Sequence, residues 1–260
     1  VELREGHERV AGVVPEHLER VGHLAVVVVG ELATDRCHRQ RRLHADDPIG
    51  FEDAERLLIN RQVQAAVFES DVRHLMTEGL PYDRCQVGVV TRMPPATGLD
   101  DLYAGDDERM PGYIRTQIDV VLPTGMAVLN AADPMVAAMA SSCPGQITFF
   151  ALDAHHPIIA THRAQGKRVL FLEGDQIVAM QGKMQMRFAL SNIPLTHSGS
   201  IDFQVENAMA AIAAAWASEV SWEHIASGLA SFVSDHNAVP GRFNVFDYRG
   251  ATLIADYGHN

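Results

Sequence analysis

The chain has 260 residues, of which 47% are hydrophobic and 21% are charged, and its formal net charge is −12. This composition is typical of a globular protein with one large or two small domains and excludes a disordered chain. The acidic balance argues against a surface that binds nucleic acid or an anionic membrane.

Short apolar runs alternate with helical patterns over the first two thirds of the chain. The runs are nearly all apolar, as strands covered on both faces of a parallel sheet are. The predicted strands are 25–29, 64–69, 86–91, 126–130 and 146–150. The predicted helices between them are 51–60, 113–122 and 134–142. This alternation predicts an α/β fold with a mostly parallel, doubly wound sheet, right-handed crossovers and flanking helices.

The pattern changes after residue 165. Three short strands with glycine-centred turns predict an antiparallel hairpin extension near residues 168–190. These strands are 168–172, 176–180 and 184–190, with turns at Gly174 and Gly182. Two helices follow, at 205–217 and 221–232, and Ser221 is the expected N-cap of the second. The last two predicted strands, 244–248 and 251–257, surround a turn at Gly250.

Four segments carry a family resemblance. They read QAAVFES…TEGLPYDRCQVGVV (64–90), GMAVLNAADPMVAAM (125–139), FQVENAMAAIAAAW (203–216) and PGRFNVFDYRGATLIADYGHN (240–260). The last two are the most specific, because D-Y-G-H-N follows a strand and is preceded by G-R-F-N. On these segments the chain resembles the Mur-ligase-like module of cyanophycin synthetases. It also resembles the second type of these enzymes, in which one ligase site works and the Mur-like part serves as a scaffold.

The resemblance implies one central ATPase domain of the Mur-ligase type over residues 1–260, with its P-loop at 1–10 and no third, lid-like domain. In the active family, ATP and Mg²⁺ convert a carboxylate into an acyl phosphate, which an amine attacks to form an amide. The family makes an aspartate–arginine polymer. The Mur-like module adds arginine, while a separate ATP-grasp module adds aspartate. The implied partners are that ATP-grasp module of the same protein, a cyanophycin-like peptide and further copies in a homo-oligomer.

Several positions depart from the family pattern. The first ten residues, V-E-L-R-E-G-H-E-R-V, stand where the family has a P-loop close to V-T-G-T-N-G-K-T-T-T. His7 therefore takes the place of the phosphate-binding Lys, and Glu8 that of the Mg²⁺-binding Thr. Gly98 stands where the family has one residue of an Asp-His pair near the metal. Arg115 stands where Mur-type ligases often carry a carbamate-forming Lys, and no Lys occurs before residue 167.

Other positions keep residues of the family pattern, and each of them also allows a purely structural role. Glu69 ends its strand where the family has a Mg²⁺-binding Glu, but the glycines that follow it in the family are missing. We therefore treat Glu69 as a vestigial metal ligand. Asn130 and Asp133 keep part of an N-A-D-D-P turn that contacts adenine in the family, although Asp133 could equally cap the next helix. Asn207 is the residue kept from an H-N-x-x-N pattern.

Three further positions match nucleotide-side residues near the hinge of the family. They are Arg242, Asp256 and His259. Arg242 could clamp a phosphate with two hydrogen bonds or pair with a surface carboxylate. Together with Asn130, Asp133 and Asn207, these are the residual candidates for nucleotide binding.

The sequence therefore predicts a module whose own ligase site is inactive, which binds no ATP or Mg²⁺ and which serves as a scaffold. Two alternatives stay open: an active ATP-dependent, arginine-adding amide ligase with a rearranged site, and a non-catalytic sensor of nucleotide or peptide. Three widely spaced cysteines favour free thiols in a reducing compartment. No apolar run approaches membrane-spanning length and no signal peptide is visible, so we expect a cytoplasmic protein.

Overall fold

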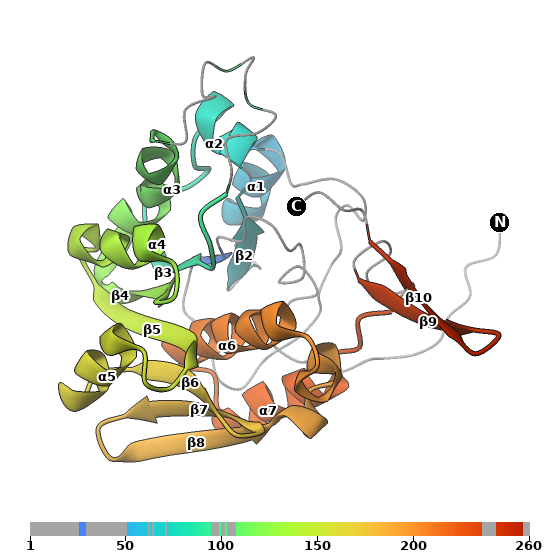
Figure 1. Cartoon of the computed structure of the whole chain (residues 1–260). Coiled ribbons are helices and arrows are strands. Elements are labelled where there is room, and N and C mark those ends of the chain that lie inside the picture. The colour runs from blue at the N-terminus through green and yellow to red at the C-terminus, as the bar shows by residue number, and fades with distance from the viewer. Residues whose placement is uncertain are drawn as a thin grey trace, which may run out of the picture.

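An eight-stranded sheet forms the centre of the molecule (Figure 1). The computed structural model describes residues 26–29, 51–61, 63, 65–70, 72–94, 99, 102, 108–235 and 243–256. The strand order is β2-β1-β3-β4-β5-β6-β7-β8. The strands are β1 (Val26–Val29), β2 (Ala66–Glu69), β3 (Cys85–Val90), β4 (Val121–Asn130), β5 (Gln146–Asp153), β6 (Val169–Glu173), β7 (Gln176–Gln181) and β8 (Met184–Ala189).

The sheet is mostly parallel, as predicted. Strands β3, β4, β5 and β6 pair in parallel. Strands β1 and β7 run in the opposite direction, and β2 and β8, which pair antiparallel with them, run in the same direction as β3 to β6. The strand predicted at 25–29 forms, but it runs antiparallel to both neighbours. The uniform apolar pattern of Val26–Val29 is the same in either direction and cannot specify which one the strand takes.

Helices cover both faces of the sheet, although the predicted doubly wound order was wrong. The parallel strands follow one another in chain order, so their right-handed crossovers place the connecting helices on one face. These helices are α3 (Met110–Asp119), α4 (Pro134–Ala138) and α5 (Pro157–Ala164). The other face is covered by α6 (Asp202–Ala217) and α7 (Trp222–Ser231), which come later in the chain (Figure 1).

The remaining helices are short or lie near the β2 end of the sheet. They are α1 (Phe51–Leu58), α2 (Val72–Thr77) and the 3₁₀ turns η3 (Met139–Ser142), η4 (Leu190–Asn192) and η5 (Pro194–Gly199). The helix predicted at 113–122 begins and ends three residues earlier, because β4 already starts at Val121. Helices α2 and α5 were not predicted. Within the described part of the chain, no helix is long and apolar enough to span a bilayer.

The predicted hairpins are confirmed. Strands β6, β7 and β8 form an antiparallel meander whose turns place Gly174 at φ 63° and Gly182 at φ 59°, a backbone region that favours glycine. Strands β9 (Asn244–Tyr248) and β10 (Ala251–Ala255) form a separate two-stranded sheet that projects from the body (Figure 1). Ser221 caps α7 by accepting a hydrogen bond from the His224 amide at 3.3 Å.

Candidate functional site

The carboxyl end of β4 brings together two of the segments singled out in the sequence. In open α/β sheets, ligands bind outside the carboxyl ends of the parallel strands. Asn130 is the last residue of β4 and is only 5% exposed. Its Nδ2 donates to Glu206 Oε1 of α6 at 3.4 Å, and its Oδ1 accepts from the Ala132 amide at 2.9 Å. Asn130 thus joins β4 to a helix 76 residues further along the chain.

Asp133 is held entirely by backbone donors. Its Oδ1 accepts from the amides of Met135 at 2.9 Å and Val136 at 3.2 Å, which makes it the N-cap of α4. Its Oδ2 accepts from the Met93 amide at 2.7 Å, which ties the segment after β3 to the turn after β4. The capping role weighed in the sequence is confirmed.

Glu206 gives the cluster its electrostatic character. Burial raises the pKa of the Glu206 carboxyl, and Asp202 on the same helix raises it further. The hydrogen bond from Asn130 and the charge of Arg92 act in the opposite direction and lower the pKa. The neighbouring Asn207, 9% exposed, donates to Gln204 Oε1 of its own helix at 3.0 Å. The surroundings of Glu206 therefore disfavour the ionised form of its carboxyl.

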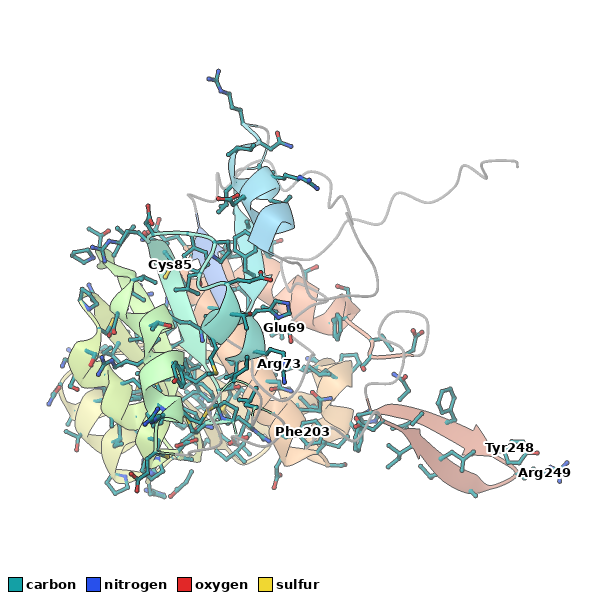
Figure 2. All side chains as sticks on the ribbon, turned by 90° about the horizontal axis from the view of Figure 1, so that it is seen from above. Glu69, Arg73, Cys85, Phe203, Tyr248 and Arg249 are labelled. Atoms are coloured by element: carbon teal, nitrogen blue, oxygen red, sulfur yellow. The ribbon has the colours of Figure 1, made fainter. Side chains whose placement is uncertain are left out.

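The other predicted residues that the structure describes lie apart from this cluster. Arg115 is half-exposed on α3 and pairs with Asp119 one helical turn away, at 3.1 Å between Nε and Oδ2. Glu69 ends β2, and Figure 2 shows it with Arg73 of the following helix. His7, Glu8, Gly98, Arg242 and His259 lie outside the described residues, so their roles stay predictions.

Asp256 stabilises the base of the β9–β10 hairpin. Its Oδ2 accepts from the Phe243 amide at 2.9 Å, and Phe243 has a φ of 47°, which is unusual for a residue with a side chain. The Phe243 ring packs edge-on against Phe203 in the first turn of α6, with ring centroids 5.3 Å apart. The hairpin base is therefore anchored on the helix that carries Glu206, while its tip at Tyr248 and Arg249 points away (Figure 2).

The chain's two lysines lie elsewhere. Lys167 lies two residues before β6, and Lys183 directly precedes β8. Both strands run in the same direction as β4, so both lysines lie at amino-terminal strand ends, whereas Asn130 lies at a carboxyl end. They are also separated from β4 by two and four strand positions in the sheet order. A side chain that supplies positive charge to a phosphate at the carboxyl end of β4 would therefore have to be an arginine or a histidine.

The described residues contain no ready set of Mg²⁺ ligands. Mg²⁺ is held by carboxylates and phosphate oxygens in near-octahedral geometry. Among the residues whose positions are described, no group of three or more His, Cys, Asp or Glu side chains is arranged to hold a metal ion. The Asp133 carboxylate is already engaged with three amides, and burial disfavours a charged Glu206.

Two curated proteins match nearly the whole chain. The chain is 32% identical over 238 residues to a cyanophycin synthetase of Crocosphaera subtropica, and 30% identical over 237 residues to one of Synechocystis. The alignments cover 90% and 89% of this chain. The chain is a relative of one segment of cyanophycin synthetase. It spans only 27% of the length of each of these two proteins.

Two solved ligase structures align with part of this cyanophycin synthetase relative. A pseudomurein peptide ligase type C from Methanothermus fervidus aligns with a TM-score of 0.45 at 19% identity, over 67% of this chain and 39% of its own. A UDP-N-acetylmuramoylalanyl-D-glutamyl-2,6-diaminopimelate–D-alanyl-D-alanyl ligase from Acinetobacter baumannii aligns with a TM-score of 0.42 at 19% identity, over 72% and 36%. No protein-family model matches the chain.

Sequence reasoning missed three contacts of this cyanophycin synthetase-like segment. It did not place Glu206 in the site, although Glu206 directly precedes Asn207 in the helix motif. It also missed the Met93 amide as a partner of Asp133, and the contact between Phe203 and Phe243. An amide donor leaves no signal in residue type, and the ring contact joins segments that are far apart in the chain.

Proposed function

We propose that this segment is the Mur-ligase-like module of a cyanophycin synthetase-type protein, that it does not itself turn over ATP, and that it serves as a scaffold. The observation that carries the proposal is the position of the lysines. Both lie at amino-terminal strand ends, away from the carboxyl-end cluster of Asn130, Asp133 and Glu206. The names of the relatives support the family role.

Phosphoryl transfer needs cationic groups aimed at the phosphate oxygens, because catalysis rests on positioning and on stabilising their charge. In the active family a P-loop lysine supplies this charge, and His7 stands at that position here. Glu8, at the position of the Mg²⁺-binding hydroxyl, adds a like charge to that of a triphosphate. The half-buried Glu206 adds a second acidic group at the carboxyl end of β4.

A scaffold role follows from what the cluster does hold together. Asn130 joins β4 to α6, Asp133 joins the turns after β3 and β4, and Phe203 joins α6 to the projecting hairpin. These contacts fix the segments that a ligase would use to position nucleotide, without a functioning phosphate site. In the longer protein, the module would position an ATP-grasp module that acts on a cyanophycin-like peptide.

The test is phosphate release by the purified chain with Mg²⁺-ATP, arginine and a cyanophycin-like primer. We expect the rate to equal that of an Asn130→Ala variant, because no reaction passes through this cluster. Release that depends on arginine and falls in the variant would instead establish an active arginine-adding ligase with a rearranged site. Saturable binding of nucleotide or primer without release would support the sensor alternative.

A further inference from the structure

One segment of this acidic chain carries an excess of positive charge. Residues 154–201 include five Lys or Arg residues and only two acidic ones, whereas the whole chain has 33 acidic residues and 21 basic ones. The segment includes α5 and the β6–β7–β8 meander, at one end of the sheet (Figure 1). Its two carboxylates, Glu173 and Asp175, flank the turn between β6 and β7. Its basic residues are Arg163, Lys167, Arg168, Lys183 and Arg187.

Two neighbouring turns bring the lysines of this segment together. A Cβ on Gly166 would lie 3.9 Å from the Gly182 Cα, so the loop before β6 contacts the turn before β8. Lys167 directly follows the first of these glycines, and Lys183 directly follows the second. The two lysines of the chain, which are far apart in the sequence, therefore lie close together at the amino-terminal ends of β6 and β8.

The charges of the two lysines are not offset. Neither ammonium group forms a hydrogen bond or a salt bridge with any residue that the structure describes. Both lysines are exposed. The neighbouring Arg168 differs, because its guanidinium donates to Gln181 Oε1 at 3.1 Å and lies 4.5 Å from the centroid of the Trp216 ring. Lys167 and Lys183 thus remain available to an anionic partner.

Strand β8, which begins at these lysines, leaves one edge of the sheet open. It is the last strand in the sheet order, and no described helix or strand lies beyond it in Figure 1. Strand β8 contains no proline, and its pairing with β7 is continuous from Gln176↔Ala189 to Gln181↔Met184. Such an edge presents unpaired backbone N–H and C=O groups, which match the backbone of an extended polypeptide. The edge therefore favours a polypeptide over a nucleic acid as the anionic partner.

One face of β8 is apolar. Phe188 belongs to the core under α6 and α7, and Met186 packs against that core. Because side chains alternate along a strand, Met184 lies on the same face as these two. Met184 is 38% exposed, so apolar surface lies uncovered at the lysine end of the strand.

The other face of β8 is polar. Alternation places Gln185 and Arg187 on it, together with Lys183 immediately before the strand. The Arg187 charge is offset, because its Nη2 lies 2.6 Å from Glu173 Oε2. The charge that is not offset on this face is therefore that of Lys183, with Lys167 in the adjacent turn.

We propose that the open edge of β8 and its two lysines form a docking surface for an extended acidic segment of a partner protein. Side chains of an added strand alternate between two faces, as those of β8 do. Carboxylates on one face meet Lys183 and Lys167, while apolar side chains on the other cover Met184. The partner segment is therefore one in which acidic and apolar residues alternate.

This docking surface goes beyond the proposed scaffold role. It lies at the last strand of the sheet and at amino-terminal strand ends, whereas Asn130 lies at the carboxyl end of β4. Peptide binding there does not depend on whether the chain turns over ATP. Failure of the one proposal therefore leaves the other standing.

Fluorescence anisotropy with the full chain tests the docking surface. The probe is a peptide of four Glu-Val repeats that carries the dye on its amino terminus. We expect saturable binding that weakens as the salt concentration rises from about 50 to 200 mM, because salt screens exposed charges. A peptide of the same composition, with its glutamates in one block and its valines in another, should bind at least about fivefold more weakly, since it cannot match both faces of the edge.

Charge reversal tests the role of the lysines. Lys167→Glu combined with Lys183→Glu should raise the Kd of the alternating peptide by more than about tenfold, because attraction becomes like-charge repulsion. The matched control combines Arg61→Glu with Arg249→Glu, which makes the same change in net charge at two exposed arginines outside the basic segment. The control should bind the peptide as the parent chain does. Circular dichroism checks that both variants fold.

Acylation of amines locates the contact. Lys167 and Lys183 are the only lysines of the chain, so an amine-reactive ester modifies these two side chains and the amino terminus. Mass spectrometry should show that bound peptide slows acylation of both lysines and leaves that of the amino terminus unchanged. Absence of binding, equal binding of the two peptides, or lysines that stay fully reactive would overturn the proposal. So would a polyphosphate of equal charge that binds more tightly than the alternating peptide.

Discussion

Asp133 shows that a residue shared with a nucleotide-binding motif can be kept for a structural reason. Its carboxylate accepts three backbone hydrogen bonds, two from the first turn of α4 and one from Met93. An N-cap of this kind contributes about 0.5–2 kcal/mol to stability without any ligand. The motif match therefore does not by itself indicate nucleotide binding. Asn130 is similar, because its side chain joins β4 to α6.

Glu206 gives a prediction at the same scale. Burial raises the pKa of its carboxyl, so the ionised form is disfavoured in the folded state. The resulting cost is absent at pH values below the unfolded-state pKa and appears as the pH rises through the folded-state pKa. Glu206→Gln, whose amide oxygen can still accept from Asn130, should raise the melting temperature at pH 7. The gain should shrink as the pH falls through the folded-state pKa and should be absent below about 4.

The matched control is Glu223→Gln, which makes the same change at an exposed carboxylate in α7. It should give no stabilisation at pH 7. Melting curves of the three proteins across the pH range decide the point. A Glu206→Gln variant that is less stable than the parent chain at neutral pH would show that the ionised carboxylate is stabilising, against this account.

At the scale of elements, the sequence predicted those whose signals are local. The β6–β7–β8 meander and the β9–β10 hairpin follow from glycine turns between short apolar runs, and the Ser221 cap follows from residue type. The direction of β1 and the same-side crossovers could not be predicted, because an apolar strand pattern carries no direction. Helix α2 is only six residues long and was missed, since so short a helix has little periodicity.

Backbone packing between β4 and β5 gives a prediction at this scale. A Cβ on Gly145 would lie 2.5 Å from the Gly125 carbonyl oxygen and 2.6 Å from that of Leu122. Backbone cannot move aside as a flexible side chain can. Gly145→Ala should therefore lower the free energy of unfolding by more than about 2 kcal/mol.

Gly112 in α3 provides the control, because a Cβ there would meet nothing within 4 Å. Gly112→Ala should be neutral or should stabilise the chain by up to about 1 kcal/mol, since alanine favours helix. Urea unfolding of both variants measures the difference. Equal effects of the two substitutions would contradict the close packing of the β4 and β5 backbones.

At the scale of the whole molecule, topology separates both lysines from the candidate site. Parallel strands bring Asn130 and Glu206 together at a carboxyl end, while Lys167 and Lys183 precede strands that run the same way. The sequence predicted that β4 and α6 would both contribute residues to the site. It could not predict their contact, because the two residues are 76 positions apart and do not form a pair of opposite charges. The positions of the lysines likewise depend on strand order.

Calorimetric titration of the chain with Mg²⁺-ATP tests whether this ligase-like fold has lost its nucleotide site. The P-loop lysine and threonine of the active family would each supply charge-assisted bonds worth about 1.5–3 kcal/mol. Losing both weakens binding by roughly a hundredfold to ten-thousandfold. We therefore predict no saturable heat at nucleotide concentrations up to about 1 mM. One-site binding with a micromolar Kd that disappears in the Asn130→Ala variant would contradict the account.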